Sequence, residues 1–370
     1  MKSERVLRAN WQSSSLVRRL EESFALEIRQ SYAYAVGRVR VLETRLLDRT
    51  RILRMLDARS VSDVFRVLAE MQYGQGARSG HESAYERVLY QEIGSAYDLI
   101  SEFVPDPRIL EVLRLKYDLH NVKVVLKSAA QREERRDLFL SVGSLSYEEI
   151  QRLSGVSETP ESERTYWNPA IDQKVESRAE VLCRAGGVPM GEGEVDPREL
   201  DIQLDKAYFC LALELSQDIG SEFLLELFRM EIDRANLQAL LRLSAMDEDE
   251  QVVRKTLIPS GHLDPERLIL LYRSSVDELL ASVDRDYQGV LKNWTKGEIP
   301  EAIEHLLSFF AVKRREHLER SKMVTFGPEP IVSYLLAKES EADAVRTVLV
   351  GKANGIGEDL IKARLGKVYA

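Results

Sequence analysis

Cysteine, glycine, proline and histidine are all scarce in this chain of 370 residues, which contains 2 Cys, 20 Gly, 11 Pro and 5 His. Two cysteines cannot build a disulfide framework or a zinc site, so we expect Cys183 and Cys210 to be buried thiols of a reducing compartment. So few turn-forming residues are unusual for an all-β protein, which needs a turn about every 8–12 residues. The chain also lacks a run of about 18 apolar residues and the apolar stretch of a secretory signal, so the sequence predicts neither a membrane span nor a leader.

Motifs of catalysis and phosphate binding are missing as well. The sequence contains no G-x-x-x-x-G-K-[ST] phosphate loop, no G-x-G-x-x-G turn, no H-E-x-x-H zinc motif and no G-x-S-x-G nucleophile turn. None of the five histidines has a second histidine three or four residues away. A net charge of −9 opposes the attraction to phosphates on which nucleic-acid binding depends. We therefore expect no catalysis, no metal or other cofactor, no small-molecule substrate and no nucleic-acid partner.

Helical periodicity is what the chain does contain. Apolar residues make up 44% and charged residues 31% of the sequence, as in soluble globular proteins. One face of a helix is predicted by residues spaced alternately four and three positions apart: Leu115, Leu119, Val122, Leu126 and Ala129. The stretch 221–244 has similar spacing, and strand-like alternation is scarce. The sequence therefore predicts an all-α protein.

A short pattern typical of a helix start occurs three times. A leucine is followed by Asp or Ser, which are good N-terminal caps, and then by apolar residues on one helix face. The three copies begin at Leu47, Leu145 and Leu263. In the second copy, Ser146 and Glu149 have the spacing of a capping box. Each copy thus predicts the beginning of a helix.

A second pattern, also in three copies, places one acidic residue on an otherwise apolar helix face. The acidic residues are Asp118, Asp233 and Glu341. Because an unpaired carboxylate is costly to bury, we expect these acids to cap a neighbouring helix or to meet an arginine. A long polar residue follows five positions later in every copy, and an asparagine follows three positions later in the first two copies. The long residues are Lys123, Gln238 and Arg346, and the asparagines are Asn121 and Asn236, whereas the third copy has Ala344.

Two ordered patterns in three copies indicate an internal repeat with a unit of about 100 residues. Solenoid repeats are usually about 30–50 residues long, so longer units favour closure around a pseudo-threefold axis over a linear stack. We predict an N-terminal extension (1–30) and three homologous helical lobes, 31–143, 144–261 and 262–370, arranged as a funnel. The helices at the two ends of the chain would complete the outer lobes.

Four segments, taken in order, resemble one known family. They are 32–74, 114–128 (RLKYDLHNVKVVLKS), 229–243 (RMEIDRANLQALLRL) and 331–365, which ends in the pattern G-x-x-E-x-L-I-x-x-R-L. The family is the C subunit of the V-type and archaeal-type (V/A) rotary ATPases, the counterpart of the d subunit of the eukaryotic V-ATPase, and the resemblance covers about residues 30–370. It implies a non-catalytic funnel in the central stalk, on the cytoplasmic face of the membrane. Such a protein joins the axle subunits D and F to the membrane proteolipid ring, so that torque passes between ATP turnover and ion movement.

The resemblance also suggests which residues contact a partner. On this interpretation, the polar residues of the second pattern line or support the funnel: Asn121, Lys123, Asn236, Gln238 and Arg346. The alternative is that they make contacts between lobes only. Arg38 and Arg40 are further candidates for the inner wall, against the alternative of a solvated helix face. The basic run 313–315, with Arg320 and Lys322, is expected to meet acidic loops of a partner or lipid headgroups, unless it is an ordinary charged helix.

Two other functions fit parts of the sequence. A soluble all-α scaffold or adaptor would keep the threefold repeat but would have no surface for a membrane ring. An all-α enzyme that uses a metal and a diphosphate would need acidic motifs on two facing helices. The acidic stretch 247–250 has no matching second motif, which argues against the enzyme.

Overall fold

The computed structural model describes residues 30–70, 73, 85–155, 178–186, 196–273 and 299–369. All regular secondary structure in these ranges is helical, which confirms the all-α prediction. Residues 30–43 form the first described helix. The α-helices that follow are α3 (Arg49–Leu56), α4 (Val61–Glu70), α5 (Tyr85–Ser101), α6 (Arg108–Gln131), α7 (Tyr147–Leu153), α8 (Arg178–Gly186), α9 (Pro197–Ile219), α10 (Glu222–Ala245), α11 (Glu250–Thr256), α12 (Pro265–Arg273), α15 (Ile299–Glu319), α16 (Glu329–Ala353) and α17 (Glu358–Tyr369). Two short 3-10 helices are η3 (Arg136–Leu138) and η5 (Arg320–Met323).

The helix starts predicted by the first pattern are present. Asp48 caps α3 by accepting a hydrogen bond from the backbone of Arg51, and Ser146 forms the expected capping box with Glu149 at the start of α7. The third copy opens α12 at Pro265. Local sequence therefore decides where these three short helices begin. Within the described ranges, no helix has the length and hydropathy needed to cross a membrane.

Three long helices carry the second pattern. They are α6, α10 and α16, with 24, 24 and 25 residues. Each buries residues on several faces rather than along one stripe, because other helices surround it. In α16 every residue from Pro330 to Leu336 is buried. The long helices are therefore central elements, and the shorter helices cover them.

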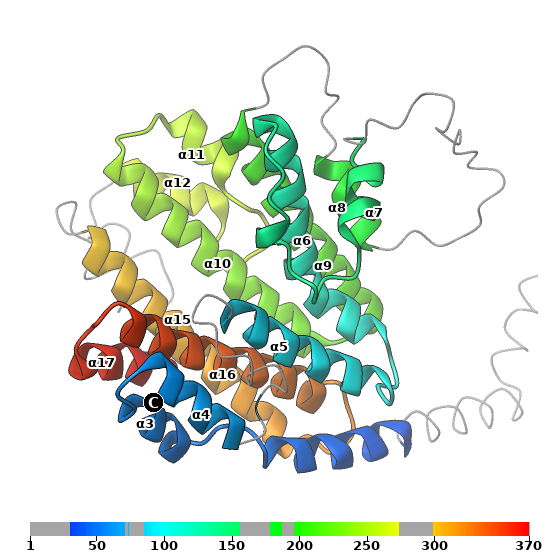
Figure 1. Ribbon diagram of the computed structural model, residues 1–370. Helices are drawn as coiled ribbons and strands as arrows, with labels where there is room; N and C mark the ends of the chain where they lie inside the picture. Colours follow the sequence, from blue (N-terminus) through cyan, green and yellow to red (C-terminus); the bar gives the residue numbers. More distant parts are fainter. Residues whose placement is uncertain are drawn as a thin grey trace, which may run out of the picture.

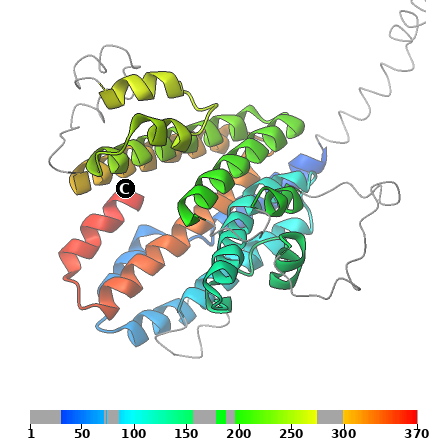
Figure 2. The ribbon, with the colours of Figure 1, turned by 90° about the horizontal axis from the view of Figure 1, so that it is seen from above.

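Each long helix has a different group of neighbours, and α9 is shared by two of them (Figure 1). Helix α6 packs against α7, α8 and α9, and α10 packs against α9, α11, α12 and α15. Helix α16 packs against α3, α4, α5 and α17. The third group is thus assembled from both ends of the chain, and Figures 1 and 2 show the blue N-terminal helices beside the orange and red C-terminal ones.

The hydrophobic core is not divided into three parts along these groups. Apolar side chains from residues 30–43, from α3 to α10 and from α16 and α17 form one continuous cluster. A second cluster lies between α10, α11, α12 and α15, around Leu240, Leu268 and Phe310. The continuous cluster joins the helices of the first and third long-helix groups, so these groups share one core rather than folding around separate ones.

The expectation of two buried thiols is right for one cysteine only. Cys183 is fully buried, and this burial raises its pKa to about 12. Cys210 is exposed, so the expectation is wrong there. It lies on α9, whose buried face includes Leu211, Ala212 and Leu215, and Cys210 falls outside that face.

We expect a core substitution in α3 to destabilise the whole fold, because α3 completes the core around α16. Met55 is 0% exposed, and Met55→Ala should lower the free energy of unfolding by about 2–5 kcal/mol. Leu53→Ala on the same helix, at a 39% exposed position, is the matched control and should cost less. Urea unfolding followed by circular dichroism measures both changes. Equal effects of the two variants would contradict the placement of α3 in the common core.

Candidate functional site

The acidic residues of the second pattern hold the backbone next to their own helices. On α6, the Asp118 carboxylate accepts hydrogen bonds from the backbone N–H and the hydroxyl of Ser144, both at 2.7 Å. On α10, Asp233 accepts one from the backbone N–H of Leu263 at 3.0 Å. Both carboxylates are nearly inaccessible to solvent, at 1% and 0% exposure. Each is therefore satisfied by the backbone just ahead of a neighbouring helix. The capping bonds of these helices come from Ser146 and Asp264, so the two acids bind before the cap and do not form the cap that the sequence had suggested.

Glu341 makes the third contact of this kind, between the two ends of the chain. Its carboxylate accepts a hydrogen bond from the backbone N–H of Leu47 at 2.5 Å and is 0% exposed. Leu47 stands directly before the cap of α3, just as Leu263 stands directly before the residue that precedes α12. In all three copies the acid of the second pattern thus binds the backbone at the leucine that opens the first pattern or at the residue directly before it. The two patterns recur together because they are two halves of one contact.

Glycine is required where a short aspartate approaches the backbone this closely. A Cβ atom on Gly143 would lie 2.7 Å from Nδ2 of Asn121 and 2.8 Å from the Asp118 carboxylate. A Cβ on Gly261 would overlap the carboxylate of the second aspartate in the same way. The third copy has Arg45 at the corresponding position, and it uses the longer Glu341 in place of aspartate. Glutamate has one methylene more than aspartate, so its carboxylate can reach the backbone of Leu47 from farther away.

Two asparagines fasten the same loops at a second point. Asn121 donates to the carbonyl of Leu140 and accepts from its N–H, both at 2.8 Å. Asn236 makes the same pair of bonds with Ile258, also at 2.8 Å. Each side-chain amide thus uses both its oxygen and its nitrogen in a backbone contact.

The third copy does without the amide for a physical reason. Leu42 precedes Leu47 by the same five positions as Leu140 precedes Leu145, but Leu42 lies in the helix 30–43. Its carbonyl already accepts a hydrogen bond from the backbone of the residue three positions later, at 3.0 Å. A helical backbone leaves nothing for an asparagine to satisfy, so Ala344 can replace it.

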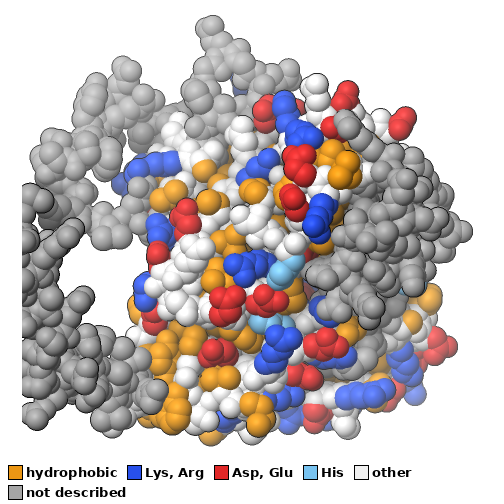
Figure 3. Space-filling model, turned by 180° about the vertical axis from the view of Figure 1, so that it is seen from behind, with side chains coloured by type: hydrophobic (Ala, Val, Ile, Leu, Met, Phe, Trp, Pro, Cys, Tyr) orange, Lys and Arg blue, Asp and Glu red, His pale blue; other side chains and the backbone are white. Residues whose placement is uncertain are grey.

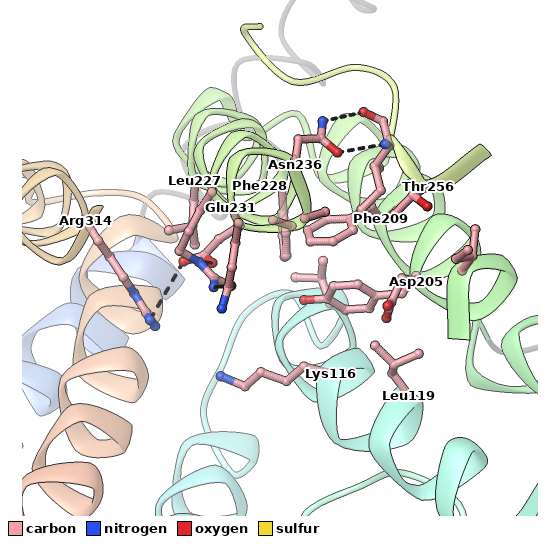
Figure 4. Close-up of a pocket in the computed structure, with 18 of the residues that line it drawn as sticks. Lys116, Leu119, Asp205, Phe209, Leu227, Phe228, Glu231, Asn236, Thr256 and Arg314 are labelled. Carbon is pink, nitrogen blue, oxygen red and sulfur yellow. Dashed lines mark hydrogen bonds and ion pairs between the residues drawn. The ribbon is translucent and has the colours of Figure 1, made fainter. Parts of the chain in front are cut away.

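A cavity of about 500 Å³ lies where α6, α9, α10 and α15 meet, with α16 contributing Leu336 (Figure 4). Its walls combine apolar side chains such as Phe228 with charged ones. Figure 4 shows Lys116, Glu231 and Arg314 approaching it from three different helices. The site is therefore shared between helices that are far apart in the sequence.

Equivalent positions of the three long helices meet beside this cavity. Lys116, Glu231 and Glu339 each stand two residues before the acid of the second pattern. Lys116 forms an ion pair with Glu339. The guanidinium of Arg314 on α15 lies 3.9 Å from the Glu231 carboxylate and 4.0 Å from that of Glu339. Arg234 pairs with Glu231 at 2.7 Å. One ionic cluster thus connects α6, α10, α15 and α16.

Glu339 stays ionised in the interior because of its partners. Burial raises its pKa, but Lys116, Arg314 and a hydrogen bond from Tyr117 outweigh this effect, and the pKa lies below its usual value. The hydroxyls of Tyr97 and Tyr117 complete the shell by donating to the carboxylate at 2.9 Å and 2.8 Å. A buried charge that is paired and hydrogen-bonded in this way avoids most of its desolvation penalty.

Glu231 is held in the charged form by the same principle. Burial raises its pKa, and Arg234, Arg314 and Lys116 together bring the pKa below its usual value. The two acids of the cluster therefore share Arg314 and Lys116 as sources of positive charge.

The seven residues proposed from the sequence are not brought together at one site. Asn236 and Gln238 line the central cavity. Arg346 lines a second pocket of about 400 Å³ beside α5 and η3. The remaining four lie at neither pocket's wall: Arg38, Arg40, Asn121 and Lys123.

Two of the long polar residues link a long helix to a neighbouring helix. Lys123 on α6 pairs with Asp205 on α9 at 2.6 Å. Arg346 on α16 pairs with Glu86 on α5 at 2.9 Å. Both are thus engaged in contacts inside the chain.

The two N-terminal arginines are also engaged. Arg38 lies 4.1 Å over the ring of Phe103, and Arg40 donates to the carbonyls of Ser321 and Lys322 at 2.8 Å and 3.1 Å. These two arginines therefore attach the helix 30–43 to the turn before α6 and to η5.

Sequence reasoning missed the ionic cluster. A signal was present, since the position two residues before the repeated acid is charged in all three copies, as Lys, Glu and Glu. For the basic run 313–315, the sequence left open a contact with a partner or lipid headgroups and an ordinary charged helix. The guanidinium of Arg314, whose side chain is 35% exposed, lies 3.9 Å and 4.0 Å from the carboxylates of Glu231 and Glu339. Local sequence could not indicate this, because the attracting carboxylates come from other helices.

Removing the charge of Glu339 should destabilise the protein, since Lys116 and Arg314 would then face a neutral amide. We expect Glu339→Gln to lower the free energy of unfolding by about 1–3 kcal/mol at pH 7. The folded pKa of Glu339 is depressed, so its contribution is present above its ordinary value of 4.5 and is lost as the pH falls through the folded pKa. The difference in the free energy of unfolding between the wild type and Glu339→Gln should therefore become smaller as the pH is lowered.

Urea unfolding at a series of pH values from 7 to 3 measures this difference in the free energy of unfolding. The exposed Glu358→Gln on α17 is the control and should have a small effect throughout. If the difference in unfolding free energy between the wild type and Glu339→Gln stays constant with pH, Glu339 is not an ionised partner of Lys116 and Arg314.

Comparison with known proteins identifies the family. The family model described as "ATP synthase (C/AC39) subunit" matches residues 35–364. The C subunit of the V-type sodium ATPase of Enterococcus hirae is 22% identical over 344 residues, which is 90% of this chain and 97% of that relative. The C subunits of the A-type ATP synthases of Thermococcus kodakarensis and Methanococcoides burtonii are 22% and 26% identical over 356 and 358 residues. These alignments cover 91% and 90% of this chain, and 91% and 94% of the relatives. The match spans most of the chain and confirms the resemblance seen in the sequence: this protein belongs to the C/AC39 family of V- and A-type ATPases and ATP synthases.

Proposed function

We propose that the chain is the central-stalk component that couples the rotating axle of a V/A-type ATPase to its membrane proteolipid ring. The observation that carries this proposal is the family membership, together with the meeting of equivalent positions from three long helices beside one cavity. The partners are the axle subunits D and F and the ring, and the complex lies on the cytoplasmic face of the membrane. The coupled process is ATP-driven or ATP-forming ion transport.

A pseudo-threefold funnel is the shape that we propose for this protein. Three copies of the carboxylate–backbone contact support it, because each fixes a short helix against a long one in the same way. The three lobes follow these contacts, around α6, α10 and α16. In this arrangement the helices of residues 30–70 complete the lobe of α16, so the third lobe contains both ends of the chain.

Stiffness is the property that a torque-transmitting part needs most. Close-packed helices supply it, since protein interiors are poorly compressible. The ionic cluster adds bonds that cross between α6, α10, α15 and α16. A twist applied to one lobe is thereby transmitted to the others without a change of fold.

The central cavity is where we propose that the tip of the axle makes contact, and Gln238 and Arg242 are the best-placed residues. Both line the cavity, and Arg242 is exposed. We predict that the double variant Gln238→Glu and Arg242→Glu binds the purified D and F subunits at least tenfold more weakly. It replaces an amide and a cation by two carboxylates at the proposed contact, so any hydrogen bond or ion pair that the amide and the cation make with the axle is lost. Biolayer interferometry measures the affinity.

The matched control for the cavity is Arg49→Glu at an exposed position of α3, away from the cavity wall. It reverses one charge and should leave the affinity for D and F unchanged. Equal binding by a folded double variant would exclude the cavity as the axle site.

Absence of a nucleotide site is the second expectation of a coupling part. We predict that isothermal titration calorimetry of the isolated chain with Mg-ATP gives no saturable heat, and that no phosphate is released. Tight ATP binding would contradict the coupling function. Co-purification of the chain with membrane vesicles that contain the proteolipid ring separates this function from that of a free all-α adaptor, which would stay in the supernatant.

A further inference from the structure

The three repeated acids differ in the second donor that each receives. Asp118 accepts from the Ser144 hydroxyl, and Glu341 accepts from the ammonium of Lys338 at 2.6 Å. The acid of the second copy instead faces Nδ1 of His262 at 2.9 Å. A serine hydroxyl and a lysine ammonium keep their protons throughout the physiological pH range, whereas a histidine does not. Only the second copy of the contact is therefore built around a group that titrates near neutral pH.

His262 is held between two carboxylates of α10. Besides the contact with Asp233, its Nε2 lies 3.1 Å from Oε2 of Glu226. An ionised carboxylate can only accept hydrogen bonds, so both ring nitrogens must carry a proton for both contacts to form. The ring that fits this geometry is the charged imidazolium. Its partner Asp233 is fully buried, while the His262 side chain is 31% exposed and can exchange its proton with solvent.

The carboxylates beside His262 favour its protonated form. The hydrogen bond to Asp233 is the main reason why the pKa of His262 is raised above 6.5, and burial opposes this effect. The hydrogen bond to Glu226 and the charges of both acids raise the pKa further. The imidazolium is thus stabilised from two sides.

A second histidine, His317 on α15, is also affected by the charge of Glu226. The charge of Arg320 in η5 acts on it as well. Burial lowers the pKa of His317, so its ring is neutral where His262 is charged, and it donates from Nε2 to the carbonyl of Phe223 at 2.9 Å. Figure 3 shows histidine side chains bordered by both acidic and basic ones near the middle of one face of the molecule. A neutral His317 adds no positive charge beside Glu226, which leaves His262 as its partner.

The loop that carries His262 also forms part of the cavity wall. Residues 257–264 are attached to α10 at two points, Ile258 by Asn236 and the segment 262–263 by Asp233. Ile258 and Asn236 both line the central cavity. A change at His262 therefore acts on a short loop that reaches the cavity.

We propose that protonated His262 fastens the loop 257–264 to α10, and that this attachment weakens when the imidazole loses its proton. The attachment is a pH-dependent element of the second repeat, and it adjusts one wall of the central cavity. Its effect on axle binding rests on the proposed function, whereas the attachment itself does not.

The direction of the pH dependence follows from the raised pKa. The attachment is complete below about pH 6.5, the ordinary histidine value, and is lost as the pH rises through the folded pKa. Loss of the proton lowers the equilibrium constant for attachment. The factor is about ten for each unit by which the pKa of His262 in the folded protein exceeds its pKa in the unfolded chain.

Two measurements on the isolated full-length chain test the attachment. NMR titration of the His262 ring should give a pKa above 6.5. Hydrogen exchange, corrected for its intrinsic pH dependence, should show that protection of the Leu263 amide falls between pH 6.5 and pH 9. The Ser144 amide, bound to Asp118 in the first copy, is the internal reference and should keep its protection. A ring pKa at or below 6.5, or constant protection of Leu263, would overturn the proposal.

Two variants separate the histidine from general effects of pH. His262→Ser copies the donor of the first copy and should remove the pH dependence at Leu263 while the protein stays folded. His305→Gln, at an exposed position on α15, should leave that dependence unchanged. A pH dependence that persists in His262→Ser would also refute the proposal.

A third measurement tests the link to the cavity. The affinity for D and F should fall between pH 6.5 and pH 9 in the wild type and change less in His262→Ser. If the chain binds the axle with an affinity that does not follow the His262 titration, the link to the cavity is wrong. If it does not bind the axle at all, the proposed function fails while the exchange data still decide the attachment.

Discussion

A buried carboxylate that must be satisfied by backbone N–H groups is the constraint on which this structure depends. Such a group is tolerated in a helical core only when donors surround it, so it dictates the position of the chain that supplies them. Asp118, Asp233 and Glu341 impose this requirement three times, and each time a short helix is fixed against a long one. The contact also explains the glycines at 143 and 261, where a side chain would collide with the carboxylate region.

The third copy shows how the same contact adapts to a different connection. The two aspartates bind loops that follow their own helices along the chain, whereas Glu341 binds Leu47 near the other end of the sequence. The acid of this copy is a glutamate, the position of the glycine holds Arg45, and the helical backbone at Leu42 makes an asparagine unnecessary. Closing the fold through this contact brings the two ends of the chain into one group of helices around α16.

Charge in the interior gives the centre of the molecule its specificity. Lys116, Glu231 and Glu339 occupy equivalent positions, and with Arg314 they form pairs that depend on one arrangement of the helices. Packing alone would tolerate small sliding movements of apolar helices, but a buried ion that loses its partner is strongly penalised. The His262 attachment differs because its donor can lose its proton, so it is the adjustable member of an otherwise permanent set.

Local sequence by itself determined the all-α class, the caps at Asp48 and Ser146, the repeated acids and their burial, because each depends on neighbours within a few residues or on helical spacing. It also contained enough family resemblance to identify the C/AC39 family. Tertiary structure alone decided that Arg314 lies beside the acids of the ionic cluster, that Lys123 and Arg346 are paired with α9 and α5, and that one cysteine is exposed. Those outcomes depend on which distant helix lies opposite, and charge complementarity between distant helices leaves no periodic signal in a single sequence.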